Sequence, residues 1–477
     1  MTVMRIFSIL SITAVSLMLT SCGSDRIFDR LNTEETLIVL TRNSPTTYYF
    51  DNDQETGFEY ELTKAFADAE GLKLRISVAF TLEDLMSSLA EGQAHVAAAG
   101  LTKTNDRDLQ FKATDPYLKQ KPLIVYKSGA SRPRNLNELV DRDIVVLAGS
   151  SHIESLKRLN QTIGNINWRE IRAADSLEIM QLVAEEKAEL AIVDSIEFRM
   201  QHGLFPRLVA ALSLEDEEDI VWYLPSLPGS DALRLRFNRF LQNHKETGAL
   251  QRLRERHFGS SKNASRIGSF TFQQKVKTTL PKWQPLIEAV AYEYQLDWRL
   301  LAAVSYQESH WDPTAISPTG VRGMMMITRA TAKDLGVIDR TDAKQSLRGG
   351  ARFIKSLSRR LPSDIPEPDR MWMVLAAYNI GMGHLEDTRV LAQKNGLDPD
   401  RWQDVRELLP RLQNPIYYSS TRYGFARGKE AVTYVDNIRH YYSVLKLQDV
   451  PGNLIAPPIA TATLLPVDWQ HAIPAAL

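Results

Sequence analysis

Two long stretches of the chain differ in how their hydrophobic positions are spaced. Between residues 36 and 259, short runs rich in aliphatic and β-branched residues alternate with amphipathic segments, beginning with the run 37–41 and the helical pattern 60–69. Further strand candidates cover residues 74–78, 94–99, 123–126, 144–147 and 190–193. Strands and helices in alternation predict an α/β fold, with helices on the faces of a mostly parallel sheet.

Beyond this stretch the strand pattern nearly disappears. From residue 283 to residue 447 the hydrophobic positions follow the helical period, which predicts a mainly α domain over residues 281–447. The intervening residues 260–280 begin with a small, polar, glycine-flanked segment and are expected to form a linker. Residues 448–477 form a tail rich in proline and alanine. The length of 477 residues also predicts a multidomain protein, because a domain typically has about 150 residues.

The N-terminus has the pattern of an export signal. Arg5 precedes an apolar run that stops at Cys22, so residues 1–21 are interpreted as a signal peptide and residues 22–35 as a tether. The residues Leu-Thr-Ser-Cys that end at Cys22 resemble the lipobox of bacterial lipoproteins, which implies a lipid anchor on that cysteine. An ordinary signal with an incidental cysteine is the alternative. Lipoproteins that stay in the inner membrane carry Asp directly after the acylated cysteine. This chain has Gly23 at that position, which favours a location in the outer membrane.

Charge and cysteine content exclude several functions. The 57 basic and 58 acidic residues leave a net charge of -1, so the chain offers no bulk attraction to nucleic acid. One cysteine permits neither an internal disulfide nor a cysteine-based zinc cluster. No HExxH motif is present, and nothing in the sequence indicates a metal or a cofactor.

Glu308 interrupts an apolar stripe in the second half of the chain. Asp297 can cap a helix in which Leu301 and Val304 lie on one face, and Glu308 is the next member of that face. Pro313 places Glu308 in the last turn of this helix. Burial and the negative helix end both disfavour a carboxylate, so we expect a raised pKa and a general acid at Glu308.

The surroundings of Glu308 resemble a known catalytic domain. Three blocks of residues carry this resemblance, and their members are Glu308, Ser309, Trp311, Pro313, Ala315, Ser317, Gly320, Gly323, Met325, Ala377, Tyr378, Asn379, Gly381, Gly383, Glu430, Thr433, Tyr434, Val435 and Asn437. They stand at the spacing and in the order of the soluble-lytic-transglycosylase domain, which has a lysozyme-like fold. The variant GMMM at residues 323–326 looks like the membrane-bound lytic murein transglycosylase F group, and Met326 departs from the glutamine that many relatives carry.

This resemblance implies a reaction that needs one carboxylate. Most glycosidases use two, but Asp312 lies in a turn, where capping or solvation explains it better than catalysis. In lytic transglycosylases one acid protonates the glycosidic oxygen and then takes the proton of the muramyl 6-hydroxyl, which closes a 1,6-anhydro ring. Glu308 takes both roles by this resemblance. The implied substrate-binding residues are Ser317, Met324, Met326, Tyr378, Asn379 and Tyr434.

The first half resembles the family 3 periplasmic solute-binding proteins, which close two hinged lobes around an amino acid. The resemblance rests on GFEYEL at 57–62, GLTKTNDRDLQF at 100–111, Pro116 with Tyr117, and Gly149 with Ser150. It implies that Thr104 and Arg107 hold a ligand carboxylate and that Asp194 takes the ammonium group. The alternative for Arg107 is a surface pair with Asp106 or Asp108. We expect an amino acid or a peptide fragment of the cell wall as the regulatory ligand.

Three interpretations of the whole chain follow. The first is a lipid-anchored transglycosylase of peptidoglycan, held at the periplasmic face of the outer membrane, with a ligand-sensing first domain. A lysozyme-type hydrolase would use the same acid with water, and it would differ only in its product. A solute receptor with an inactive wall-binding domain is the third, and Met326 is the feature that favours it.

Overall fold

The structure is a computed structural model that describes residues 26–51, 54–173, 175–259, 266–317 and 320–449. The predicted signal peptide, Cys22 and nearly all of the predicted tail lie outside these residues. Within them, no helix has both the length and the hydrophobicity needed to cross a bilayer. The chain divides into two compact units, which are described separately: the first holds the described residues up to Phe198 together with Leu208–His257, and the second holds Arg199–Arg207 and Phe258–Gln448.

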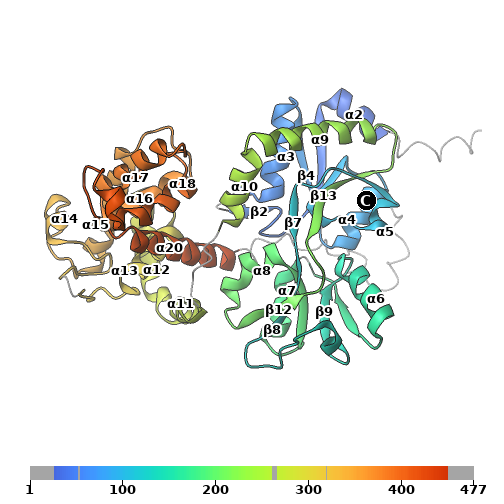
Figure 1. Cartoon of the computed structure of the whole chain (residues 1–477), viewed down its shortest axis with the longest axis horizontal. Helices are drawn as coiled ribbons and strands as arrows, with labels where there is room; N and C mark the ends of the chain where they lie inside the picture. The colour runs from blue at the N-terminus through green and yellow to red at the C-terminus, as the bar shows by residue number, and fades with distance from the viewer. Residues whose placement is uncertain (1–25, 52–53, 174, 260–265, 318–319, 450–477) are drawn as a thin grey trace, which may run out of the picture. The chain divides into compact units, whose positions relative to one another are not determined.

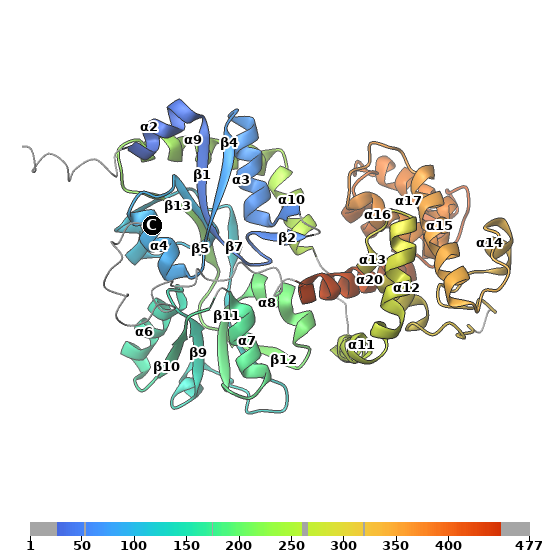
Figure 2. The same cartoon turned by 180° about the vertical axis from the view of Figure 1, so that it is seen from behind.

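The first unit consists of two α/β lobes (Figure 1). The sheet of the first lobe has the order β4-β1-β5-β13-β6, and β7 also pairs with β13. Its strands β1 (Thr36–Arg42), β4 (Lys73–Ala79) and β5 (Val96–Thr102) are parallel and lie side by side in Figure 2. Helices α3 (Phe58–Ala69), α4 (Leu82–Ala90) and α9 (Ser230–Glu246) pack on this sheet. Leu37, Val96 and Ala97 have no more than 1% of their surface exposed.

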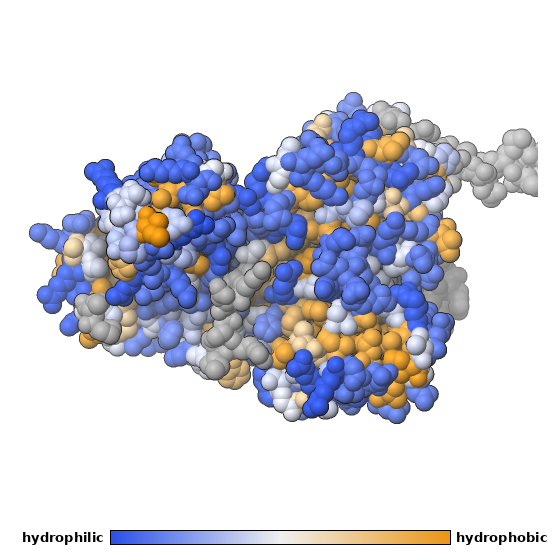
Figure 3. Space-filling model, in the orientation of Figure 1, coloured by the Kyte–Doolittle hydropathy of each residue, from blue (hydrophilic) through white to orange (hydrophobic). Residues whose placement is uncertain are grey.

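The second lobe has its own sheet in the order β10-β9-β11-β8-β12. Strands β9 (Ile144–Leu147), β10 (Trp168–Ile171) and β11 (Leu190–Asp194) are parallel, whereas β8 (Pro122–Lys127) and β12 (Leu208–Ser213) run antiparallel to their neighbours. Helices α6 (His152–Ile163) and α7 (Ser176–Ala184) pack on this sheet. Figure 3 shows hydrophobic residues gathered on the face of this lobe. Tyr126, Trp168 and Leu212 are only partly buried against its core.

The chain crosses between the lobes twice. It leaves the first lobe after β7 (Leu118–Gln120) and returns through β13 (Glu218–Pro225), which pairs antiparallel with β5, β6 (Phe111–Ala113) and β7. Both sheets are therefore mixed, where the sequence predicted mostly parallel strands. The acidic run 215–219 leads into β13, and its last two residues form the start of that strand.

Two segments that the sequence assigned to connections are helical. Within the predicted tether, α2 (Arg26–Glu34) buries Ile27, Phe28 and Leu31. Within the predicted linker 260–280, α11 (Arg266–Thr278) buries Phe272 completely in the core of the second unit. In both helices, apolar residues three or four positions apart form a single face. The pattern is short and its neighbours are polar, so a scan of the sequence in longer windows does not predict a helix there.

The second unit is mainly helical in the part that the structure describes, as the sequence predicted. Its core packs α12 (Leu280–Glu293) and α13 (Trp298–Ser309) against α15 (Ala343–Arg360), α16 (Asp369–Ile380) and α20 (Gly428–Asp449). Shorter or more peripheral helices complete it: α14 (Arg329–Asp334), α17 (Met382–Lys394), α18 (Trp402–Leu408) and α19 (Pro415–Tyr418). The fully buried side chains of Leu301, Val304 and Leu375 lie in this core.

Candidate active site and ligand pocket

The position of Glu308 is set by the two ends of helix α13. At the N-terminus, the Asp297 side chain accepts a hydrogen bond from the backbone N–H of Arg299 at 2.9 Å, so Asp297 is the predicted N-cap. At the C-terminus, His310 adopts a left-handed conformation with φ 55° and stops the helix. Glu308 therefore lies in the last turn, at the edge of the core that Leu301 and Val304 help to form.

The carboxyl group of Glu308 is half-buried and has one close partner. The Tyr434 hydroxyl on α20 donates a hydrogen bond to Glu308 Oε1 at 2.5 Å. Burial raises the pKa of Glu308 to about 7, and the bond from Tyr434 acts in the opposite direction. Among the described residues, no second carboxyl group contributes to this pKa. The site thus holds a single acid that is partly protonated near neutral pH.

A pair of tyrosines forms one wall of the site. The rings of Tyr378 and Tyr434 are nearly parallel, with an interplanar angle of 9° and centroids 6.5 Å apart. The Tyr378 hydroxyl donates to the carbonyl oxygen of Met325 at 2.8 Å. Burial, followed by the charge of Glu308, raises the pKa of Tyr378 well above its usual range, so its hydroxyl stays protonated. The structure therefore brings together Glu308, Tyr378 and Tyr434 from three different helices.

A tight turn at Gly323 fixes the backbone beside the acid. Gly323 has φ +88°, and a Cβ atom there would lie 1.7 Å from the carbonyl oxygen of Arg340. No other residue fits this position without moving the backbone. The Ser309 hydroxyl, next to Glu308, donates to the Met324 carbonyl oxygen at 2.9 Å and so ties α13 to the turn.

The remaining predicted substrate residues occupy different environments. Met324 is completely buried in the core, so its side chain packs away from solvent, whereas Met326 is half-buried and has φ 44°. The Ser317 hydroxyl accepts a hydrogen bond from the Val321 N–H at 3.2 Å within its own loop. Asn379 is exposed on the last turn of α16.

Asp312 has the capping role that the sequence favoured over catalysis. Its Oδ1 accepts hydrogen bonds from the backbone N–H of Thr314 at 2.8 Å and from the Thr314 hydroxyl at 2.7 Å. These bonds lower the pKa of Asp312. A carboxylate held in an exposed turn, with a low pKa, is suited neither to donating a proton nor to acting on the bond that Glu308 would break.

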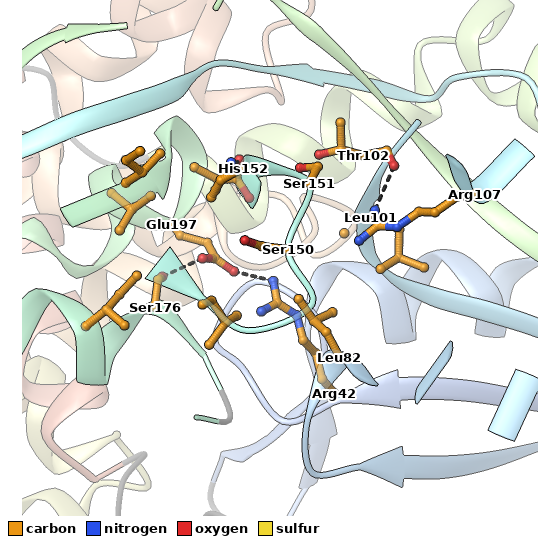
Figure 4. A pocket seen from close by; sticks show the side chains of 16 residues that line it. Arg42, Leu82, Leu101, Thr102, Arg107, Ser150, Ser151, His152, Ser176 and Glu197 are labelled. Carbon is orange, nitrogen blue, oxygen red and sulfur yellow. Dashed lines mark hydrogen bonds and ion pairs between the residues drawn. The ribbon is translucent and has the colours of Figure 1, made fainter. Parts of the chain in front are cut away.

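The first unit contains a small pocket to which both lobes contribute (Figure 4). Arg42, at the end of β1, forms a buried ion pair with Glu197 of α8 (Ser195–Gln201) at 2.5 Å. The Glu197 carboxylate also accepts a hydrogen bond from Ser176. Arg107, in α5 (Asn105–Asp108), points into the same pocket, and its guanidinium donates to the carbonyl oxygens of Thr102 at 2.8 Å and Gly149 at 3.0 Å.

The three residues predicted to hold the regulatory ligand are only partly brought together. Arg107 and Asp194 both line the pocket, and Arg107 is buried rather than paired with Asp106 or Asp108 on the surface. Thr104 lies outside the lining. Its hydroxyl accepts from the backbone N–H of Arg107 at 3.3 Å and donates to Glu154 at 2.8 Å.

His152, which lines the pocket, and Glu218, which lies close to Asp194, were not identified from the sequence. Together with the predicted Asp194 they offer one potential ligand atom each, and these atoms lie within 4.8 Å of one another. Burial raises the pKa of Asp194 well above its usual range, raises that of Glu218 to about 7 and lowers that of His152 to about 4. Such a trio can accept hydrogen bonds from an ammonium group or coordinate a cation. The sequence alone does not show this group, because its members lie far apart in the chain, on α6, β11 and β13.

Comparison with known proteins agrees with both units. The family model described as bacterial extracellular solute-binding proteins, family 3, matches residues 37–260, and the model described as transglycosylase SLT domain matches residues 285–399. Among solved structures, a mutant of ArgBP from T. maritima is 22% identical and has a TM-score of 0.44. That match covers 49% of this chain and all of the other. The L-arginine-bound AbpA from Streptococcus pneumoniae is 21% identical and has a TM-score of 0.44. That match covers 48% of this chain and 98% of AbpA.

The two units together define a class of modular enzyme, in which a solute-binding-like module is joined to a lysozyme-like transglycosylase domain. Relatives match both parts at once. A membrane-bound lytic murein transglycosylase F of Ectopseudomonas mendocina is 43% identical over 90% of this chain and 88% of its own length. The protein of the same name from Idiomarina loihiensis is 42% identical over 94% of this chain and 98% of its own length. The chain belongs to the membrane-bound lytic murein transglycosylase F family.

Proposed function

We propose that the chain is a peptidoglycan lytic transglycosylase in which Glu308 performs both proton transfers. Its substrate is the β-1,4 bond between N-acetylmuramic acid and N-acetylglucosamine, and its products carry 1,6-anhydromuramic acid ends. One observation carries this proposal. Glu308 is half-buried, its pKa is about 7, and its close partner is the neutral hydroxyl of Tyr434 rather than a second carboxylate.

The reaction divides into two steps at this one group. Protonated Glu308 gives its proton to the glycosidic oxygen as the bond to the muramyl C1 breaks. The resulting carboxylate, stabilised by the Tyr434 hydroxyl, then takes the proton of the muramyl 6-hydroxyl as that oxygen bonds to C1. The donated proton leaves on the released sugar hydroxyl, the proton of the 6-hydroxyl restores protonated Glu308 as the anhydro ring closes, and no water is consumed. Excluding water from C1 is what separates this reaction from hydrolysis.

The residues around Glu308 supply contacts for the sugar. Tyr378 and Tyr434 place an aromatic wall beside the acid, with their hydroxyl groups held by Met325 and Glu308. We assign Ser317 and Tyr378 to the distorted sugar and exposed Asn379 to the muramyl group. Met326, half-buried next to the Gly323 turn, takes the place of the glutamine of many relatives and offers an apolar contact instead.

Product mass tests the reaction type. Purified sacculi digested by the wild-type chain should release fragments whose muramyl ends are lighter by one water than reducing ends, and Glu308→Gln should release none. Asp312→Asn is the matched control, because it removes an exposed carboxyl four residues away, and it should digest like wild type. Reducing ends in the wild-type digest would instead identify a hydrolase, and undigested sacculi would favour a receptor with an inactive wall-binding domain.

The pocket of the first unit supports a ligand-sensing role. Buried Arg107 and half-buried Asp194 offer a cation and an acid for the two charged groups of an amino acid or muropeptide. Thr104 contributes through the first turn of α5, whose Arg107 N–H it binds, rather than through the lining. Titration calorimetry with stem peptides should give binding heat to the full chain and none to Asp194→Asn. Equal heats would remove Asp194 from the ligand site.

The anchoring of the chain is also part of this proposal. The relatives are named membrane-bound, which supports membrane association of this chain. We assign the anchor to acylated Cys22 and the location to the periplasmic face of the outer membrane, on the lipobox-like residues and Gly23. Radiolabelled palmitate should enter the wild type but not Cys22→Ala, and gradient-separated membranes should show the labelled chain in the outer fraction. Label in the Cys22→Ala chain would contradict the lipobox interpretation.

We propose domain boundaries that follow the two compact units. The first domain would run from α2 to about residue 257, and the catalytic domain would begin at α11, whose Phe272 packs in the core of the second unit, instead of at residue 281. A catalytic fragment that starts at residue 266 should therefore be more stable than one that starts at residue 281, as a thermal melt would show.

A further inference from the structure

Positive charge and aromatic rings coincide in residues 411–429 of the second unit, a connection that contains the short helix α19 and ends in the first residues of α20. We call it the basic aromatic loop. It contains Arg411, Arg422, Arg427 and Lys429 and no acidic residue, although the chain as a whole has a net charge of -1. It also contains Tyr417, Tyr418, Tyr423 and Phe425. A local excess of cations in an otherwise neutral chain indicates an anionic partner.

The rings are held outward on a fixed base. Leu412 and Ala426 are buried in a small core with Leu391 and Leu408, and Asp387 of α17 accepts hydrogen bonds from the backbone N–H groups of Arg422 at 3.0 Å and Tyr423 at 2.8 Å. Tyr423 and Phe425 remain 53% and 54% exposed, and Ile416 is 78% exposed. The loop is thus built to present apolar surface to a partner rather than to cover the core.

Cations stand directly beside the rings. The guanidinium of Arg422 lies 5.5 Å from the centroid of the Tyr423 ring, and that of Arg411 lies 5.3 Å from the centroid of Tyr417. Arg411 and Arg427 have only distant, exposed carboxylate partners at 3.7 Å. Among the described residues, Arg422 and Lys429 form no ion pair. An aromatic face next to a free cation suits a sugar ring that carries a carboxylate, because the C–H face of the sugar stacks on the ring and the cation binds the acid.

The loop adjoins residues that we assign to the substrate at two points. Tyr423 packs over the start of α17, where a Cβ atom on Gly383 would lie 2.9 Å from its ring, and Asn379 is four residues before that glycine. At its other end the loop leads into α20 at Gly428, and Tyr434 follows six residues later, about 9 Å along the helix. We propose that the basic aromatic loop is an accessory binding surface for the peptidoglycan strand, contacting its sugar faces and the carboxylates of its peptide stems. This inference rests on the proposed function for the identity of the polymer.

Binding without cleavage tests the surface. In the full-length Glu308→Gln chain, which leaves the polymer intact, cosedimentation with purified sacculi gives an apparent Kd. Tyr423→Ala with Phe425→Ala should raise that Kd at least ~fivefold. Arg422→Ala with Lys429→Ala should raise it by a similar factor at low salt and much less at high salt. Tyr292→Ala is the control, since that tyrosine is 89% exposed on α12, and it should bind like the parent.

The outcomes separate the possible occupants. If both double variants bind sacculi like the Tyr292→Ala control, the proposal is overturned. If they keep sacculus binding but lose binding to phosphatidylglycerol vesicles, the loop is a membrane surface and the glycan assignment is wrong. A melting temperature within about two degrees of the parent excludes misfolding, and the charge variants test the surface with Tyr423 itself still in place on Gly383. Product mass from the wild-type chain decides the transglycosylase reaction separately, so either proposal can fail alone.

Discussion

The hydroxyl of Tyr434 donates a 2.5 Å hydrogen bond to Oε1 of Glu308 across 126 residues of sequence. The bond favours the ionised form of an acid whose burial favours the protonated form. The pKa of about 7 is the balance of these two effects. A group that must first give a proton and then take one back works best with such an intermediate pKa.

Removing that hydroxyl should shift the balance. Tyr434→Phe takes away the bond that lowers the pKa of Glu308, so the pKa rises and the alkaline limb of the rate profile moves to higher pH. The maximum rate should fall by about tenfold or more, because a hydrogen bond to a charged group is worth about 1.5–3 kcal/mol. The pH dependence of kcat/KM on soluble glycan strands measures both. A lower rate with an unmoved alkaline limb would mean that Tyr434 only supports the fold.

The raised pKa of Glu308 also makes the stability of the second unit pH-dependent. The folded pKa of about 7 exceeds the usual value of about 4.3, so the folded state holds more protons between these pH values. Stability therefore falls as pH rises through this window. Glu308→Gln should melt at about the wild-type temperature at pH 4.5 and on the order of a few degrees higher at pH 8.

Asp312→Asn provides the comparison for this titration. The pKa of Asp312 is lowered, so its carboxylate stabilises the folded chain above the unfolded pKa, and the variant should lose a little stability at pH 8 rather than gain it. A Glu308→Gln chain that is no more stable than wild type at pH 8 would show that Glu308 is solvated and ionises normally.

The turn at Gly323 should not tolerate a side chain. Gly323→Ala places Cβ at 1.7 Å from the Arg340 carbonyl oxygen, which forces the backbone of Met324 and Met325 to move. We expect a loss of at least ~2 kcal/mol of stability and most of the activity, because Ser309 and Tyr378 bond to those two carbonyl groups. Gly320→Ala also changes a glycine with positive φ but meets no atom within 4 Å, so it should cost only about 1 kcal/mol. Chemical denaturation measures both, and equal losses would contradict the steric argument.

The buried ion pair of the first unit should be sensitive to the loss of one partner. Glu197→Gln leaves the Arg42 guanidinium buried without its carboxylate, and we expect a loss of about 3–5 kcal/mol in urea unfolding. Asp143→Asn breaks the exposed pair with Arg169 in the same unit and should cost at most about 1 kcal/mol. If both variants lose the same amount, the Arg42–Glu197 pair is solvated rather than buried.

Local pattern is sufficient for much of the fold. The strands β1, β5, β8, β9 and β11 follow from short aliphatic runs, since a buried strand must be apolar wherever it lies in the chain. The edge strand β4 buries only its last residue, and it follows from the alternation of apolar and polar residues in its sequence. The pattern is misleading where tertiary contacts override local polarity. Glu218 belongs to an acidic run that is typical of a loop, yet it starts β13, because pairing with β7 satisfies its backbone.

The two sites differ in how much the sequence could show. Glu308 was identifiable because an acid on an apolar helix face is an anomaly that a single segment displays. Tyr434 lies on its own apolar stripe and is indeed buried in the core, so only the fold reveals that its hydroxyl reaches Glu308. Arg42 and Glu197 are 155 residues apart and show no local anomaly. Met324 was expected at the substrate because of its neighbours, and burial places its side chain in the core.

In the proposed reaction, Glu308 gives one proton to the substrate and takes another from it, so the surrounding medium is left chemically unchanged. Over one such turnover no acid or base is released, and no solvent oxygen enters the product. Digestion in water labelled with heavy oxygen would consequently leave every new muramyl terminus unlabelled. Cutting of this kind depends neither on buffering capacity nor on a supply of free water inside a dense polymer mesh.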